Sequence, residues 1–159
     1  MGVITVGIGE WAVSRNGEDT IKTYALGSCV AVMIYDVKVR VGGLIHIALP
    51  ESSVDPKKAS VQPGYFADTG LPHMIEEMKK LGASRTGVWV KLAGGASVMD
   101  ASGYFDIGKR NVLAIKRILW KSSLGPVAED TGGSNSRTVA FSLSDGAVVL
   151  SSGPKTWNI

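Results

Sequence analysis

The 159-residue chain has little of the residues from which disulfides and metal sites are made. It contains one cysteine, Cys29, and two histidines, His46 and His73. A single cysteine excludes an intrachain disulfide, and we infer a reducing compartment, the cytoplasm. No C-x-x-C or H-E-x-x-H pattern occurs, so the ligand spacings typical of zinc proteins are missing. We therefore expect no metal and no cofactor.

Long apolar runs and blocks of like charge are missing too. The longest apolar stretch, Val41–Leu49, is about half as long as a membrane-spanning helix and contains His46. The first ten residues have neither the basic region nor the apolar core of a secretory signal. Lys and Arg number 17 against 14 Asp and Glu, scattered along the chain. We expect no membrane insertion, no nucleic-acid partner and a single domain over residues 1–159.

Glycines near the N-terminus imitate a dinucleotide-binding fingerprint. Gly7-x-Gly9-x-x-Ala12 follows an expected strand, but the fingerprint needs a helix that starts at its second glycine. The residues after Gly9 show no sustained apolar face before the turn signal Asn16-Gly17. We therefore reject a nucleotide site here.

Hydrophobic periodicity predicts strands at both ends of the chain and two helices between them. Apolar residues recur every three or four positions within 65–81 and 107–124, which predicts the two helices. Strands are predicted at 2–8, 21–26, 30–35, 41–49, 86–92, 127–129, 137–143 and 147–150. We expect 30–35 and 41–49 to pair as a hairpin. The fold class is therefore α/β or α+β, with a mainly mixed β-sheet in layered packing.

One cysteine and one histidine are placed where they could form a catalytic pair. Cys29 follows Gly27-Ser28, so its thiol lies where a glycine turn enters an apolar strand. His46 is the one polar residue of the other hairpin strand. Pairing the strands about the midpoint of their connection places position 29 opposite position 47, beside His46. An imidazole there can take the thiol proton and favour the nucleophilic thiolate.

A catalytic imidazole needs a third group that holds its tautomer and orientation. Thr23 is a nearby hydroxyl on the preceding strand. The residues alone leave simpler interpretations open. A lone cysteine is more often a small buried hydrophobe, and a lone histidine in a strand is usually a core residue with its hydrogen bonds made.

Short motifs follow one another in a fixed order along nearly the whole chain. They are Leu26-Gly-Ser-Cys-Val30 with Thr23 upstream and His46-x-x-Leu-Pro50 downstream, Tyr65-Phe-Ala-Asp-Thr69, Lys91-Leu-Ala-Gly-Gly-Ala96, Ile107-Gly-Lys-Arg-Asn111, and Glu129-Asp-Thr-Gly-Gly133 with Arg137-Thr138. In this order the motifs resemble the CheD family of chemoreceptor glutamine deamidases. Two positions depart from the family pattern: Ala93 stands where an aromatic residue is common, and Ser136 where glycine usually precedes the arginine.

The resemblance implies a Cys-His-Thr site formed by Cys29, His46 and Thr23. It also implies a layered mixed-sheet sandwich with two main helices, similar to the bacterial toxin deamidases. The implied reaction is hydrolysis of receptor glutamine side chains to glutamate and ammonia. We expect backbone N–H groups near Ser28 and Cys29 to hold the oxyanion, with Gly27 and Ser28 as candidate substrate or oxyanion residues. Chemoreceptor cytoplasmic helices and a CheC-type phosphatase are the implied partners.

Two other functions stay open. The chain could be a regulatory binding module that controls a CheC-type phosphatase, with weak or dispensable catalysis. Such a module would have little need of Cys29, His46 and Thr23 together, so their presence favours an enzyme. A redox sensor based on Cys29 is the third alternative, and it is weakened because no second cysteine is present to form a disulfide with it.

Overall fold

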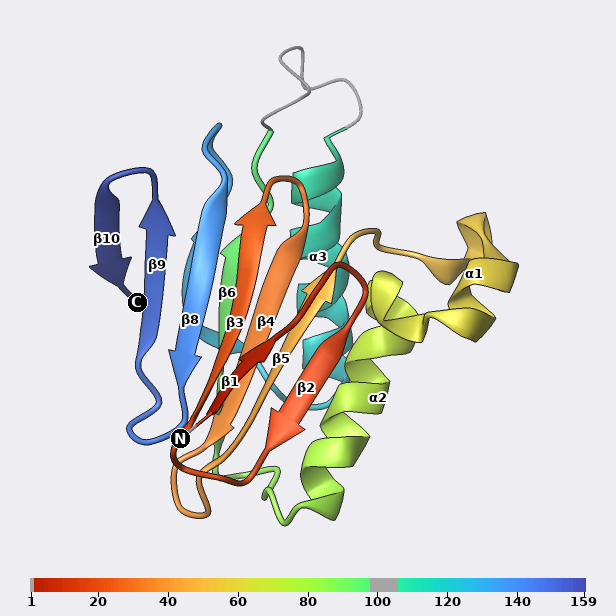
Figure 1. Ribbon diagram of the computed structural model, residues 1–159. Coiled ribbons are helices and arrows are strands. Elements are labelled where there is room, and N and C mark those ends of the chain that lie inside the picture. Colours follow the sequence, from red (N-terminus) through yellow and green to blue (C-terminus); the bar gives the residue numbers. More distant parts are fainter. Residues whose placement is uncertain (1, 98–105) are drawn as a thin grey trace.

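The computed structural model describes residues 2–97 and 106–159. Within these ranges the strands form two five-stranded sheets, of order β1-β3-β8-β9-β10 and β2-β5-β4-β6-β7 (Figure 1). Both sheets are mixed, because β1 runs parallel to β3 and β6 runs parallel to β7 while the other pairs are antiparallel. The strands are β1 (Gly2–Thr5), β2 (Trp11–Ser14), β3 (Asp19–Leu26), β4 (Val30–Asp36), β5 (Val41–Ile47), β6 (Val88–Gly94), β7 (Pro126–Thr131), β8 (Arg137–Ser142), β9 (Val148–Ser152) and β10 (Lys155–Asn158).

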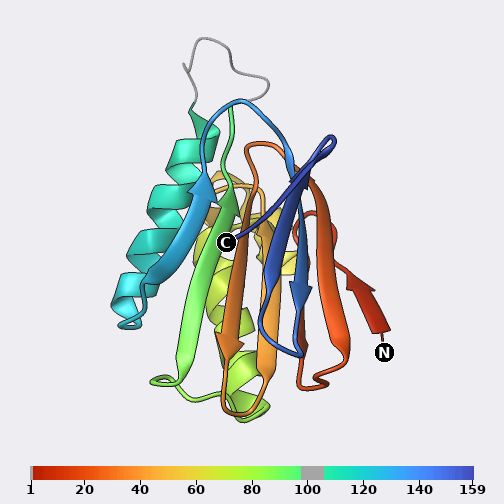
Figure 2. The ribbon, with the colours of Figure 1, turned by 90° about the vertical axis from the view of Figure 1, so that its left-hand side faces the viewer.

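Two long helices, α2 (Ala67–Lys80) and α3 (Ile107–Lys121), cover the face of the second sheet that is turned away from the first (Figure 2). Their apolar stripes explain this placement, since Leu71, Met74 and Ile115 are fully buried against the sheet. A short helix, α1 (Pro56–Val61), and the 3₁₀ turns η1 (Ser52–Val54) and η2 (Pro63–Tyr65) connect β5 to α2. The layered mixed-sheet fold with two main helices, predicted from the sequence, is confirmed.

The central strands β4 and β5 are buried on both faces, which explains their continuous apolar sequence. On β4, Val30 and Val32 belong to the core beneath the helices. Ala31 and Met33 alternate with them and belong to a second core between the two sheets. Residues that point toward the first sheet therefore lie in the interior of a sandwich.

The hairpin of β4 and β5 forms as predicted, but its register differs by one position. Val30 pairs with Ile47 and Ala31 pairs with His46, so the expected pairing of 29 with 47 is wrong. The reason is that Asp36 stays in β4 and pairs with Val41, leaving a connection of four residues. The Asp36 carboxylate stabilises this shorter turn by accepting the Lys38 amide proton at 3.0 Å.

The glycines near the N-terminus do not open a helix. After Gly9 the chain forms β2, which pairs with β5 and was not predicted. This strand confirms the rejection of the dinucleotide fingerprint. The described parts of the chain contain no helix that is long and apolar enough to span a membrane. The single domain predicted for residues 1–159 stays a prediction.

Candidate active site

Thr23 and His46 meet across the space between the two sheets. Thr23 lies on β3 of the first sheet and His46 on β5 of the second, and both side chains are buried. Thr23 Oγ1 lies 2.7 Å from His46 Nδ1 and also 2.7 Å from the carbonyl oxygen of Val6. The carbonyl can only accept, so the hydroxyl donates its proton to Val6 and its oxygen accepts Nδ1–H. This places the unprotonated nitrogen of a neutral ring at Nε2.

The burial of His46 keeps its ring neutral. Burial lowers the pKa of His46 from 6.5 to about 4, so the ring is neutral near pH 7. Its Nε2 is buried and has no hydrogen-bond partner among the described residues. Buried polar atoms are almost always paired, and an unpaired acceptor at this position is free to receive a proton.

Cys29 lies at the entrance to β4, directly before the residue that pairs with Ile47. Its half-buried side chain packs against the core between the sheets, the same space into which His46 points. Burial raises the pKa of the thiol above 9.0, and a hydrogen bond from its own backbone N–H opposes this rise. The resting thiol is therefore protonated. Nε2 of His46 forms no hydrogen bond to it in the structure described.

The three carbonyl groups of Gly27, Ser28 and Cys29 are all held by hydrogen bonds from other segments. Gly27 O accepts the Ala96 amide and Cys29 O accepts the Gly95 amide, both at 2.8 Å. Ser28 O accepts a side-chain amide from α3 at 2.9 Å. Across the described ranges, no residue accepts a hydrogen bond from the Ser28 amide, and the Cys29 amide bonds only its own thiol. These are the amides expected near an oxyanion, whereas Gly27 contributes a bonded carbonyl.

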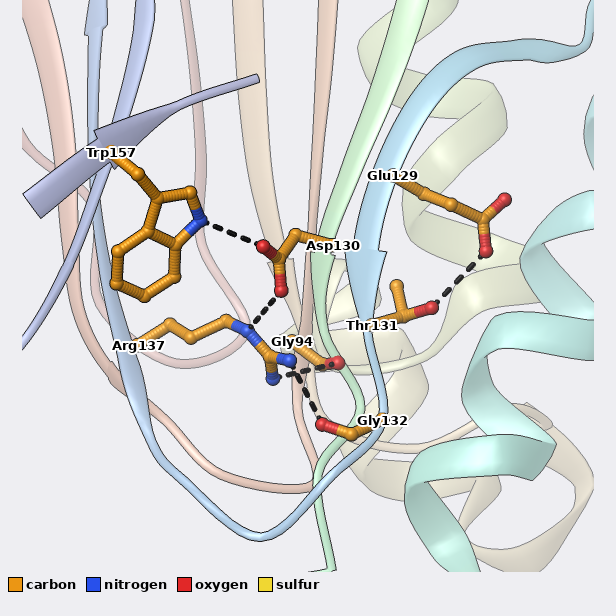
Figure 3. Close-up of polar contacts among 7 residues, drawn as sticks. All are labelled: Gly94, Glu129, Asp130, Thr131, Gly132, Arg137 and Trp157. Atoms are coloured by element: carbon orange, nitrogen blue, oxygen red, sulfur yellow. Dashed lines mark hydrogen bonds and ion pairs between the residues drawn. The ribbon is translucent and has the colours of Figure 1, made fainter.

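The double-glycine turn after β6 is shaped to fit against Cys29. Gly94 has a φ of +114°, and a Cβ there would lie 2.3 Å from Cys29 O, so only glycine fits. Buried Arg137 holds this turn by donating to Gly94 O at 3.3 Å and to Gly132 O at 2.9 Å (Figure 3). Asp130 orients the guanidinium, accepting from Arg137 Nε at 2.9 Å and from Trp157 Nε1 at 2.7 Å. The motifs contain Gly94, Asp130 and Arg137, but spacing alone assigned them no role.

The second histidine is not part of this arrangement. His73 is exposed on α2, with Nδ1 2.6 Å from the Thr69 carbonyl and its ring centroid 5.9 Å from that of Trp11. Residues 2–97 and 106–159 contain no group of three His, Cys, Asp or Glu side chains that could hold a metal ion. The structure thus joins Thr23 to His46 by a hydrogen bond and packs Cys29 against the same inter-sheet core, without a hydrogen bond between Cys29 and His46 among the described residues.

By its fold the chain is an α+β sandwich of two mixed sheets with helices on one outer face. A family model described as CheD chemotactic sensory transduction matches residues 48–152. A protein of Syntrophotalea carbinolica named "Probable chemoreceptor glutamine deamidase CheD" is 48% identical over 162 aligned positions, which cover 100% of both chains. The chain belongs to the CheD family.

Two further relatives carry the same kind of name. "Probable chemoreceptor glutamine deamidase CheD 1" of Syntrophus aciditrophicus is 45% identical, covering 96% of this chain and 95% of its own. "Probable chemoreceptor glutamine deamidase CheD" of Pyrococcus abyssi is also 45% identical, covering 91% of this chain and 88% of its own. The family-model match begins after Thr23, Cys29 and His46, whereas the alignment with the Syntrophotalea protein includes them.

Proposed function

We propose that this protein deamidates glutamine side chains of chemoreceptors, using Cys29 as nucleophile, His46 as general base and acid, and Thr23 to orient the imidazole. The observation that carries the proposal is the buried Thr23–His46 hydrogen bond, which leaves Nε2 unprotonated in the space into which Cys29 packs. The printed names of the relatives supply the substrate class.

The first step forms a thioester. As the Cys29 sulfur attacks the glutamine carboxamide carbon, its proton passes to His46 Nε2 and the carbonyl electron pair moves to oxygen. The amides of Ser28 and Cys29 donate to this oxyanion. The imidazolium then protonates the leaving nitrogen, the carbon–nitrogen bond breaks and ammonia departs.

The second step regenerates the thiol. Nε2 takes a proton from water as the water oxygen attacks the thioester carbon, and the carbon–sulfur bond then breaks. The departing thiolate recovers a proton from the imidazolium, leaving glutamate. Because burial disfavours both thiolate and imidazolium in the resting site, proton transfer accompanies attack rather than preceding it.

Each turnover adds a negative charge to a receptor helix, which changes repulsion along the helix bundle. The substrate would be the cytoplasmic helices of chemoreceptors, which places the reaction in the cytoplasm. A CheC-type phosphatase is the second partner we propose.

The test is conversion of glutamine to glutamate in a purified cytoplasmic receptor fragment, located by peptide mass spectrometry. We expect deamidation by the unmodified chain and none by Cys29→Ala or His46→Gln. His73→Gln is the matched control, because it alters the exposed histidine and should retain full activity. No deamidation by the unmodified chain would refute the proposal. If such a chain still bound a CheC-type phosphatase, and Cys29→Ala bound it equally, the regulatory module would be the better interpretation.

A further inference from the structure

Asn111 is a buried polar residue to which the steps above give no role. It lies near the N-terminal end of α3 and its exposed fraction is 0%. Its Nδ2 lies 2.9 Å from the carbonyl oxygen of Ser28 and 3.0 Å from that of Ala48. Ser28 directly precedes Cys29, and Ala48 follows His46 by two residues. One side-chain nitrogen therefore joins α3 to the segments that carry both reacting groups.

The hydrogen bonds of Asn111 are specific to a carboxamide. The NH₂ group has two protons, and each is directed to one of the two carbonyls. An ionised aspartate has the same shape but no proton to donate. Oδ1 of Asn111 is buried without a partner among the described residues, so the two donated bonds are the contacts that favour an asparagine here.

The bond to Ser28 also determines where the Cys29 amide points. Ser28 C=O and Cys29 N–H belong to one planar trans peptide unit, so they point in opposite directions. Holding Ser28 O toward α3 turns the Cys29 N–H away from α3. The bond from the Ala96 amide to Gly27 O fixes the direction of the Ser28 N–H in the same way.

We propose that Asn111 is a positioning residue that aims the Cys29 N–H at the oxyanion and ties the Cys29 turn to the end of the His46 strand. Asn111 itself does not touch the substrate, because its side chain is fully buried. The identity of the natural substrate in this inference rests on the proposed function. Any acyl transfer to Cys29 would need the same donor, which allows a test without a receptor.

Two reactions of the Cys29 thiol separate this role from a general structural one. With p-nitrophenyl acetate, sulfur attacks the ester carbon through an oxyanion, p-nitrophenolate leaves and the thiol proton is released. With iodoacetamide, sulfur displaces iodide from a saturated carbon, the thiol proton is again released, and no oxyanion forms. The ratio of the acylation rate to the alkylation rate therefore reports on the oxyanion donors and not on thiol exposure.

The variants are Asn111→Asp and Asn111→Ala, compared with Ile115→Ala. Ile115 is equally buried one turn further along α3 and packs in the helix-side core, so its truncation loosens α3 without removing a bond to Ser28. We expect the rate ratio to fall about 10- to 100-fold in both Asn111 variants, somewhat less than the ~10²–10³-fold loss on removing an oxyanion donor. The ratio should be unchanged in Ile115→Ala, even where this variant lowers Tm as much as the Asn111 variants do.

An unchanged ratio in the Asn111 variants would overturn the proposal, as would equal losses in both rates. So would an unmodified chain whose Cys29 is acylated no faster than free cysteine. An unmodified chain that is acylated rapidly but leaves receptor glutamines intact would refute the proposed substrate. The role of Asn111 would then still be decided by the ratio of acylation to alkylation rates in its variants.

A measurement on the unmodified chain covers the case in which neither Asn111 variant folds. An aldehyde analogue of a glutamine side chain adds to Cys29, with a new sulfur–carbon bond and the thiol proton transferred to the aldehyde oxygen. That oxygen occupies the oxyanion position, so the Cys29 amide proton resonance should move downfield on binding. No movement would show that the amide is not aimed there, and the proposal would fail.

Discussion

Lowering the pH should destabilise this protein through one residue, His46. In the unfolded chain the imidazole takes up a proton near pH 6.5, whereas in the folded chain it does so only near pH 4. The contribution of neutral His46 to the free energy of unfolding is therefore complete above pH 6.5. It falls as the pH is lowered from 6.5 and is lost at about pH 4. The full difference is worth about 3 kcal/mol, of which about 2 kcal/mol is lost by pH 5.

The assay is urea unfolding of the unmodified chain and His46→Asn at pH 7.5 and pH 5. The free energy of unfolding should fall about 2 kcal/mol further in the unmodified chain than in His46→Asn, because asparagine does not titrate. His73→Asn is the matched control and should keep the full pH dependence, since it leaves the buried ring in place. If His46→Asn lost stability as steeply as the unmodified chain, burial would not lower the pKa of His46, and this reasoning would be refuted.

Three further predictions concern the groups around Cys29. Thr23→Val should lower kcat in the receptor assay by at least about 100-fold, because valine cannot accept the hydrogen bond from His46 Nδ1–H that keeps Nε2 unprotonated. Thr23→Ser keeps the hydroxyl and should retain most of the activity. Gly94→Ala should cost about 3 kcal/mol in urea unfolding, since its Cβ meets Cys29 O at 2.3 Å. Gly132→Ala, with φ of +84° and no atom of residues 2–97 or 106–159 within 4 Å of its Cβ, should cost only about 1 kcal/mol. Equal losses in the two variants would contradict the argument. Arg137→Lys should cost about 2 kcal/mol by the same measurement, because Nε, Nη1 and Nη2 of the guanidinium each bond a different acceptor and lysine has a single nitrogen in their place. A neutral result would show that the guanidinium does not hold the turn.

The sequence by itself determined the elements that depend on local periodicity. The apolar stripes of α2 and α3 repeat every three or four residues, and the continuous apolar strands β4 and β5 flank a short polar connection, so each could be predicted from its own residues. The ordered motifs also sufficed for the CheD family, which the family model and the relatives show.

Other features were missed because their signal is not local. β2 and β10 are four residues long and owe their structure to the partner strands β5 and β9. The register of β4 and β5 was misjudged by one position, since the side chain of Asp36 decides where the turn begins. Strand pairing depends on a partner elsewhere in the chain, which periodicity does not identify.

At the candidate site the sequence supplied residue types, and only the tertiary structure supplied their relations. Cys29 and His46 could be predicted to lie near each other because Cys29 directly precedes one strand of a hairpin and His46 lies in the other strand. The bond from His46 Nδ1 to Thr23 joins two different sheets, and it alone determines which ring nitrogen is free. The bonds from Asn111 join positions 63 and 83 residues apart in the chain. Tautomer and amide direction are set by such long-range hydrogen bonds, which exist only once the sheets and α3 have packed together.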